Sequence, residues 1–178
     1  MDITITEALA EVPTITKRIA KKQQAVLDYL ARPAAMRDPH PDKGGSVAFV
    51  SQQLQGIADL EQRLIDIRSG IARANASTTI TVGDKTRTIT DWLTWRREVA
   101  EGQRNRLAAM ANYLRGIRQK AQQSGAKVST DQTDGLSDWL VNVNEQDLSE
   151  QIEALETTLG ALDGQLSLRN ATVTITLP

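Results

Sequence analysis

The side chain best suited to chemistry in this sequence is its single histidine, His40, which lies between Pro39 and Pro41 with Asp38 and Asp42 close by. A protein metal site needs three or four ligands in a defined geometry, and one imidazole with two loop carboxylates falls short of that. The absence of cysteine excludes disulfides, thiolate zinc sites and cysteine nucleophiles. We therefore expect His40 to be a solvated loop residue, and we expect no metal and no cofactor.

Patterns of catalytic residues are also missing. The sequence contains no Ser-His-Asp arrangement, Walker motif, Gly-x-Gly-x-x-Gly motif or His-Glu-x-x-His motif. The paired carboxylates Glu150 and Glu153 fall on the outer face of a predicted helix, outside any pocket context. These observations predict that the protein is not an enzyme.

A basic cluster, Lys17, Arg18, Lys21 and Lys22, spans adjacent turns of a predicted helix and could contact phosphate. The alternative is a solvated face, or one that pairs with acidic residues of a partner helix. The net charge of −1 argues against a general nucleic-acid binder, because such domains carry a basic excess. Nucleic acid is therefore the weakest of the partners considered.

The elements that position these residues occur twice along the 178-residue chain. Residues 4–9 (TITEAL) recur as residues 88–93 (TITDWL), and residues 75–82 (NASTTITV) recur as residues 170–177 (NATVTITL). This predicts a single domain built from two tandem repeats, residues 1–83 and 84–178, related by a pseudo-two-fold.

Apolar residues three or four positions apart predict two helices in each repeat. In the first repeat they span residues 7–31, where Pro13 predicts a kink or a short entry turn, and residues 47–74. Between them, residues 32–46 hold three prolines and two glycines, which predicts a mobile loop.

In the second repeat a helix capped by Thr90 is expected to run to about residue 123, followed by a loop over residues 124–138. A short strand is expected at residues 139–143, and Asn144 is expected to cap the last helix.

Alternating threonine and isoleucine predicts strands at residues 2–6, 78–90 and 171–177. The middle segment is a predicted hairpin with Gly83-Asp84 in a type II′ turn, and the terminal strands are expected to pair near it in one small antiparallel sheet. The fold class is therefore α+β, mainly α, with two long helical hairpins joined by this sheet. The residues expected to pair and pack the strands are Ile3, Ile5, Ile80, Val82, Ile89, Val173, Ile175 and Leu177.

The last helix carries leucines and one isoleucine at coiled-coil spacing, which predicts a packing or oligomer interface. These residues are Leu148, Ile152, Leu155, Leu159, Leu162 and Leu166. Residues 84–130 hold ten Lys or Arg against four Asp or Glu, whereas residues 131–170 hold nine acids against one Arg. This complementarity favours antiparallel pairing of the two helices.

Several of these segments resemble the septicolysin-like family of small helical bacterial proteins. The resemblance lies in residues 71–77, Gly83-Asp84, residues 88–93 with Arg96-Arg97, residues 139–143 followed by Leu148 and Gln151-Ile152, and residues 5–9 leading to Lys17-Arg18-Ile19. It covers most of the chain except the loops near residues 32–46 and 122–135. The family name implies a lysin, although no segment here is apolar enough to insert into a membrane.

Together these observations predict a non-enzymatic structural protein that forms homo-oligomers and joins other proteins in a larger particle such as a phage virion. The alternatives are a septicolysin-like membrane-active protein and, less favoured, a nucleic-acid-associated regulator. The first residues lack the basic and apolar regions of a signal peptide, so we expect a cytoplasmic protein or one assembled into a particle.

Overall fold

A computed structural model describes residues 1–41 and 44–178 and confirms an α+β, mainly α fold in which 69% of the chain is helical. The chain forms two compact units. The first unit comprises Met1–Thr78 and Ser167–Pro178, and the second comprises Thr79–Leu166. The chain passes between the units after Thr78 and again within its last helix.

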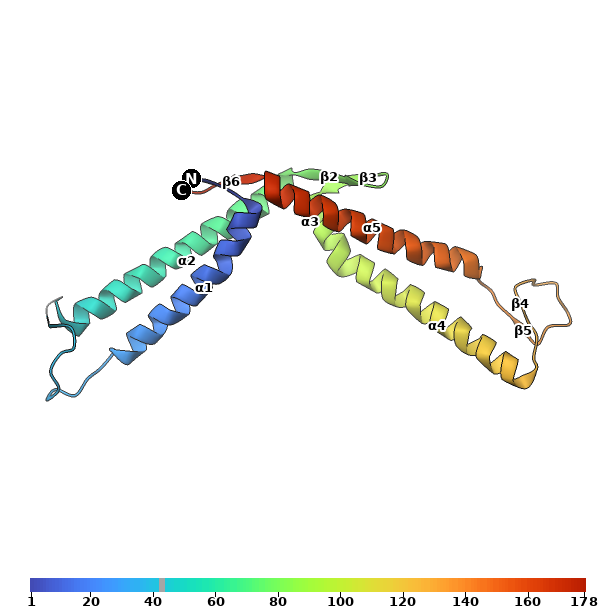
Figure 1. Ribbon diagram of the computed structural model, residues 1–178, viewed down its shortest axis with the longest axis horizontal. Coiled ribbons are helices and arrows are strands. Elements are labelled where there is room, and N and C mark those ends of the chain that lie inside the picture. The colour runs from blue at the N-terminus through green and yellow to red at the C-terminus, as the bar shows by residue number, and fades with distance from the viewer. Residues whose placement is uncertain (42–43) are drawn as a thin grey trace. The chain divides into compact units, whose positions relative to one another are not determined.

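The first unit is a helical hairpin closed at one end by a ribbon made from both chain termini (Figure 1). Strand β1 (Asp2–Thr4) pairs antiparallel with β6 (Thr174–Thr176), as predicted, and the hairpin consists of α1 (Ile5–Asp28) and α2 (Gly45–Ser77). Thr4 ends the strand and starts the helix, because its hydroxyl accepts a hydrogen bond from the Glu7 amide while the Glu7 carboxylate accepts one from the Thr4 amide.

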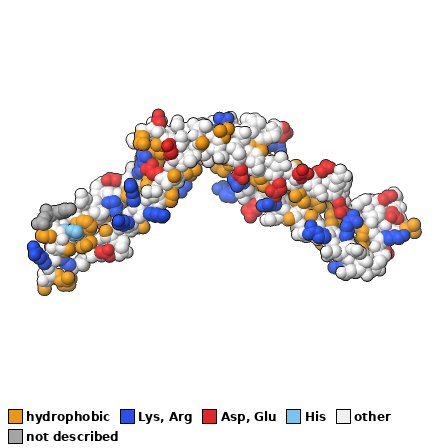
Figure 2. Space-filling model, in the orientation of Figure 1, with side chains coloured by type: hydrophobic (Ala, Val, Ile, Leu, Met, Phe, Trp, Pro, Cys, Tyr) orange, Lys and Arg blue, Asp and Glu red, His pale blue; other side chains and the backbone are white. Residues whose placement is uncertain are grey.

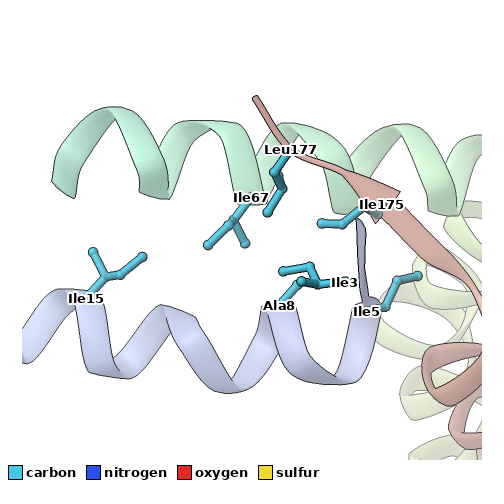
Figure 3. Close-up of a cluster of buried hydrophobic side chains, with 7 residues drawn as sticks. All are labelled: Ile3, Ile5, Ala8, Ile15, Ile67, Ile175 and Leu177. Carbon is cyan, nitrogen blue, oxygen red and sulfur yellow. The ribbon is translucent and has the colours of Figure 1, made fainter. Parts of the chain in front are cut away.

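The core of the first unit lies between α1 and α2, and the ribbon residues join it at one end (Figure 3). Ile3 and Ile175 face each other across the ribbon and pack with Ile67 of α2. Gly70 of α2 allows this approach, since a Cβ there would lie 3.1 Å from Cδ1 of Ile175. The ammonium group of Met1 donates a hydrogen bond to the carbonyl of Leu177 at 2.8 Å, which joins the two termini.

The second unit is also a helical hairpin with a ribbon at its base. Strands β2 and β3 lead into one long helix that contains a π-helical segment, η2, and a loop then leads to the last helix. The bounds are β2 (Thr79–Val82), β3 (Lys85–Thr88), α3 (Ile89–Thr94), η2 (Trp95–Ala100), α4 (Glu101–Ser124), β4 (Val128–Ser129), β5 (Trp139–Leu140) and α5 (Glu145–Thr172).

The β2–β3 hairpin has the predicted two-residue turn. Gly83 has a φ of 60° whereas Asp84 has a negative φ, which fits a type II′ turn and not a type I′ turn. Ile80, Val82 and Ile89 are all buried, as the alternation predicts, and they pack with Trp92, Leu162 and Leu166.

Several predicted details are corrected by the structure. Thr88, not Thr90, caps the helix after β3, because its hydroxyl accepts a hydrogen bond from the Asp91 amide at 3.1 Å. Pro13 lies inside α1, which starts eight residues earlier, so it does not delimit an entry turn. The predicted strand at residues 139–143 is limited to β5, which pairs in parallel with β4 from the preceding loop. Asn144 does accept a hydrogen bond from the Gln146 amide just before α5 begins.

The threonine and isoleucine strands form separate two-stranded ribbons and not one sheet, within residues 1–41 and 44–178. The reason is that each ribbon packs on its own helical hairpin: Ile3 and Ile175 in the first unit, and Ile80 and Val82 in the second. A two-stranded ribbon is marginal in water but becomes stable against helices. Each ribbon combines one strand from each predicted repeat, and the repeats and their pseudo-two-fold remain predictions.

The helices of the second unit run antiparallel, as their charges predict. Arg96, near the start of the first helix, pairs with Asp163 near the end of α5, and Arg118 pairs with Glu145 at the start of α5. Midway along the two helices, Arg104 forms a third ion pair with Glu156. Because all six side chains are substantially exposed, each pair contributes about 0 to 1 kcal/mol and mainly favours this orientation.

We expect Leu162→Ala to lower the free energy of unfolding by about 2–5 kcal/mol, because it empties a fully buried position against Trp92. Leu168→Ala, on the same helix but 54% exposed, should change it by less than about 0.5 kcal/mol. Urea denaturation followed by circular dichroism measures both, and equal effects would contradict this core.

Glycines provide a second matched pair. A Cβ at Gly160 of α5 meets no atom within 4 Å, so Gly160→Ala should stabilise the protein by about 1 kcal/mol through helix propensity. Gly70→Ala gains the same helix propensity but crowds Cδ1 of Ile175, at a cost of about 1–3 kcal/mol, so it should stabilise the protein less than Gly160→Ala or destabilise it. Thermal melts of the two variants test this, and equal stabilisation by Gly70→Ala and Gly160→Ala would show that β6 does not approach α2 as described.

Candidate functional site

The predicted coiled-coil seam of α5 lies inside the second hairpin. Its residues pack on Ala100, Leu107 and Trp92 of the facing helix. Leu148, Leu155, Leu162 and Leu166 are buried, and Ile152 and Leu159 are half-buried against the same cluster. The seam therefore serves packing within one chain, and an oligomer would need another surface.

The predicted strand residues all lie in or beside the ribbons. Ile3, Ile175, Ile80 and Val82 are buried strand residues, whereas Ile89 begins α3. Ile5, Val173 and Leu177 flank the ribbon of the first unit: the Ile5 amide donates to the Val173 carbonyl, and the Leu177 amide donates to the Met1 carbonyl.

The predicted basic cluster divides between a groove and open solvent. Arg18, Lys21 and Lys22 line a groove between α1 and α2 with a volume of about 640 Å³, and Ala25, Phe49 and Leu60 form part of its apolar wall. Lys22 donates a hydrogen bond to Gln53 and passes over Gly56, where a Cβ would lie 2.8 Å from its Nζ. Lys17 lies outside this groove.

His40 belongs to an aromatic cluster at the end of the first hairpin, so the expectation of a solvated side chain is wrong. Its half-buried ring stacks on Phe49 with centroids 4.3 Å apart, and Tyr29 lies 4.8 Å from His40 and 5.1 Å from Phe49. Among the described residues, Nε2 of His40 has no hydrogen-bond partner. Asp42, considered above as a neighbour of His40, lies outside the described residues.

Asp38 joins the loop to the start of α2. Its carboxylate accepts hydrogen bonds from the backbone amides of Ser46 and His40 and from the Ser46 hydroxyl, at 2.8–3.2 Å. These donors, the Ser46 amide first, lower the pKa of Asp38 from 3.8 to about 2. The network satisfies the Ser46 amide, which the first turn of α2 would otherwise leave unpaired.

Large apolar side chains are exposed around this aromatic cluster. We call Leu27, Leu30, Met36 and Val47 the hairpin-tip patch; each is at least 60% exposed, and Val47 reaches 84%. Figure 2 shows hydrophobic side chains gathered at this end of the hairpin around His40, coloured pale blue. An apolar group of this kind, beside the basic groove, is the candidate functional site.

Two further properties of the described residues concern metal ions and membranes. The part of the chain that the structure describes contains no group of three or more His, Cys, Asp or Glu side chains able to hold a metal ion. None of its helices combines the length and apolarity needed to cross a membrane. The aromatic cluster was missed from sequence because Tyr29, His40 and Phe49 come from the end of α1, the loop and α2, and no local pattern links them.

Comparisons with known proteins give information on the fold and none on the function. No family model matches the chain, and no curated protein matches it. The crystal structure of a functionally unknown conserved protein from Corynebacterium diphtheriae is similar, with a TM-score of 0.55 and 15% sequence identity. The match covers 99% of this chain and 100% of that protein, so the fold is shared over the whole length.

The depressed pKa of Asp38 gives a testable pH dependence. The stabilisation from its hydrogen bonds is fully present above the ordinary value of 3.8 and is lost as the pH falls through about 2. In an NMR titration, the amide protons of Ser46 and His40 should therefore shift with a midpoint near 2. Asp38→Asn should abolish that transition, and a midpoint at or above 3.8 would contradict the network.

Proposed function

We propose that this protein is a non-enzymatic structural component that associates with copies of itself and with other proteins in a larger particle, such as a phage virion. The observation that supports this most is the hairpin-tip patch, where four large apolar side chains remain exposed. Covering apolar surface contributes about 25 cal/mol per Å², which makes such a patch a favourable contact for a partner.

The construction of the first hairpin supports the same proposal. The apolar face of α5 is already used within the chain, whereas the hairpin-tip patch has no partner among the described residues. Asp38 and the aromatic cluster join residues 38–40 to the start of α2, and these contacts lower the conformational entropy that association at this end would cost.

The ribbon of the first unit offers a second contact. Strands β1 and β6 pair only with each other within the described residues, so each retains an outer edge. Such edges accept further strands through backbone hydrogen bonds, the usual means of strand addition between subunits. Their length of three residues makes this contact subsidiary to the hairpin-tip patch.

One observation favours a membrane-active protein, the septicolysin-like alternative. The hairpin-tip patch lies on the same hairpin as Arg18, Lys21 and Lys22, and apolar side chains next to cations suit the surface of an anionic bilayer. The nucleic-acid alternative would use these three cations alone, without the patch.

Self-association is tested by multi-angle light scattering at micromolar concentration. We expect the wild-type protein to be oligomeric, and Val47→Asp to weaken association at least about tenfold, because it places a charge in the patch. Val47 lies in the first turn of α2, where the helix dipole favours an acid, so the substitution should not unfold the helix. Leu168→Asp, at an exposed position outside the patch, is the matched control.

A monomeric wild-type protein would contradict homo-oligomerisation. Leakage from anionic vesicles that depends on Val47 would instead support the membrane-active alternative, and DNA binding that weakens with salt would support the nucleic-acid one.

A further inference from the structure

A second, independent feature lies in the second unit. A cavity of about 450 Å³ opens at the base of its hairpin, within the size range of small-ligand sites. Its apolar lining includes Trp92, Leu107 and Leu155, which are buried, and Trp95, which is half-buried. The turn and strand residues of the β2–β3 ribbon complete one side.

The polar part of this cavity is positively charged. Lys85, Arg87 and Arg106 line it, with Asp84 as the one acid. None of these three cations forms an ion pair in the part of the chain that the structure describes. Other arginines of the same hairpin do: Arg96, Arg104 and Arg118 each pair with an acid of α5. The cations around the cavity are therefore available to an anion.

The two tryptophans are held in fixed positions. Trp92 donates a buried hydrogen bond from Nε1 to the carbonyl of Ile80 at 3.2 Å, and Trp95 stands edge-on to it with centroids 5.5 Å apart and an interplanar angle of 88°. The guanidinium of Arg87 lies 5.4 Å from the centre of the Trp92 ring. Trp95 also begins the π-helical segment η2, and single π-helical turns occur frequently at functional sites.

From this geometry we propose that the cavity binds a small organic anion that combines a flat ring with a phosphate group, the class of a nucleoside monophosphate. The ring packs against Trp95 and the apolar lining, while Arg87 and Arg106 provide charge-assisted hydrogen bonds to the phosphate. Lys85 contributes a further positive charge at the rim. This inference does not depend on the proposed structural role.

The test uses the three indole N–H signals in a nitrogen–proton NMR spectrum of the full chain. Adenosine monophosphate should shift the signals of Trp92 and Trp95 saturably, and should leave that of Trp139, in β5 away from the cavity, unchanged. Adenosine and inorganic phosphate supply the ring and the anion separately, and each should bind at least about tenfold more weakly than the nucleotide.

Arg106→Gln should weaken binding of the nucleotide about tenfold, because it removes a charge-assisted donor while leaving the apolar lining intact. Lys120→Gln is the matched control, since Lys120 is another exposed cation of α4 that lies outside the cavity. Unchanged tryptophan signals at millimolar nucleotide would overturn the proposal. Equal affinity for inorganic phosphate, or an equal effect of the two substitutions, would overturn it too.

Discussion

The structure depends on the two-stranded ribbons that close the open ends of the helical hairpins. The hairpins themselves contain few aromatic residues. In the first unit this closure is the Ile3–Ile175 pair of the β1–β6 ribbon, which packs with Ile67 beneath it. Its two strands come from opposite ends of the chain, so the hairpin α1–α2 cannot complete its core until the last residues are in place. Such a large sequence separation imposes a high loop-closure cost, which the burial of several isoleucines must offset.

Local signals in the sequence predicted most of the elements. Apolar periodicity located the helices, and Gly83-Asp84 specified the type II′ turn because glycine alone readily adopts its positive φ. The cap at Thr88 was misplaced to Thr90 because the Thr-Ile-Thr segment offers two similar hydroxyls, and only the hydrogen bond from the Asp91 amide to Thr88 distinguishes them. The π-helical segment η2 and the division into two ribbons depend on tertiary packing and left no local signal.

The candidate site was harder to predict because it results from contacts between distant residues. A heptad pattern such as that of α5 reports a packed face, but it cannot distinguish a partner in the same chain from one in another copy. His40 was visible as a lone histidine, yet its environment depends on Phe49 from α2 and on the way Asp38 fixes the loop. Exposure of Leu27 or Val47 likewise follows only once the core residues are known.

The two predicted repeats have similar strand-to-helix junctions, but the helices that follow these junctions differ. Thr4 and Thr88, 84 positions apart, cap their helices in the same way, and the isoleucine after each is buried. At the next aligned buried position the first hairpin has Ala8, whereas the second has Trp92. The junctions of both hairpins thus share a threonine cap and a strand pairing, whereas the buried side chains of the helices differ. This explains how one architecture holds an exposed apolar tip in one hairpin and a cationic, tryptophan-lined cavity in the other.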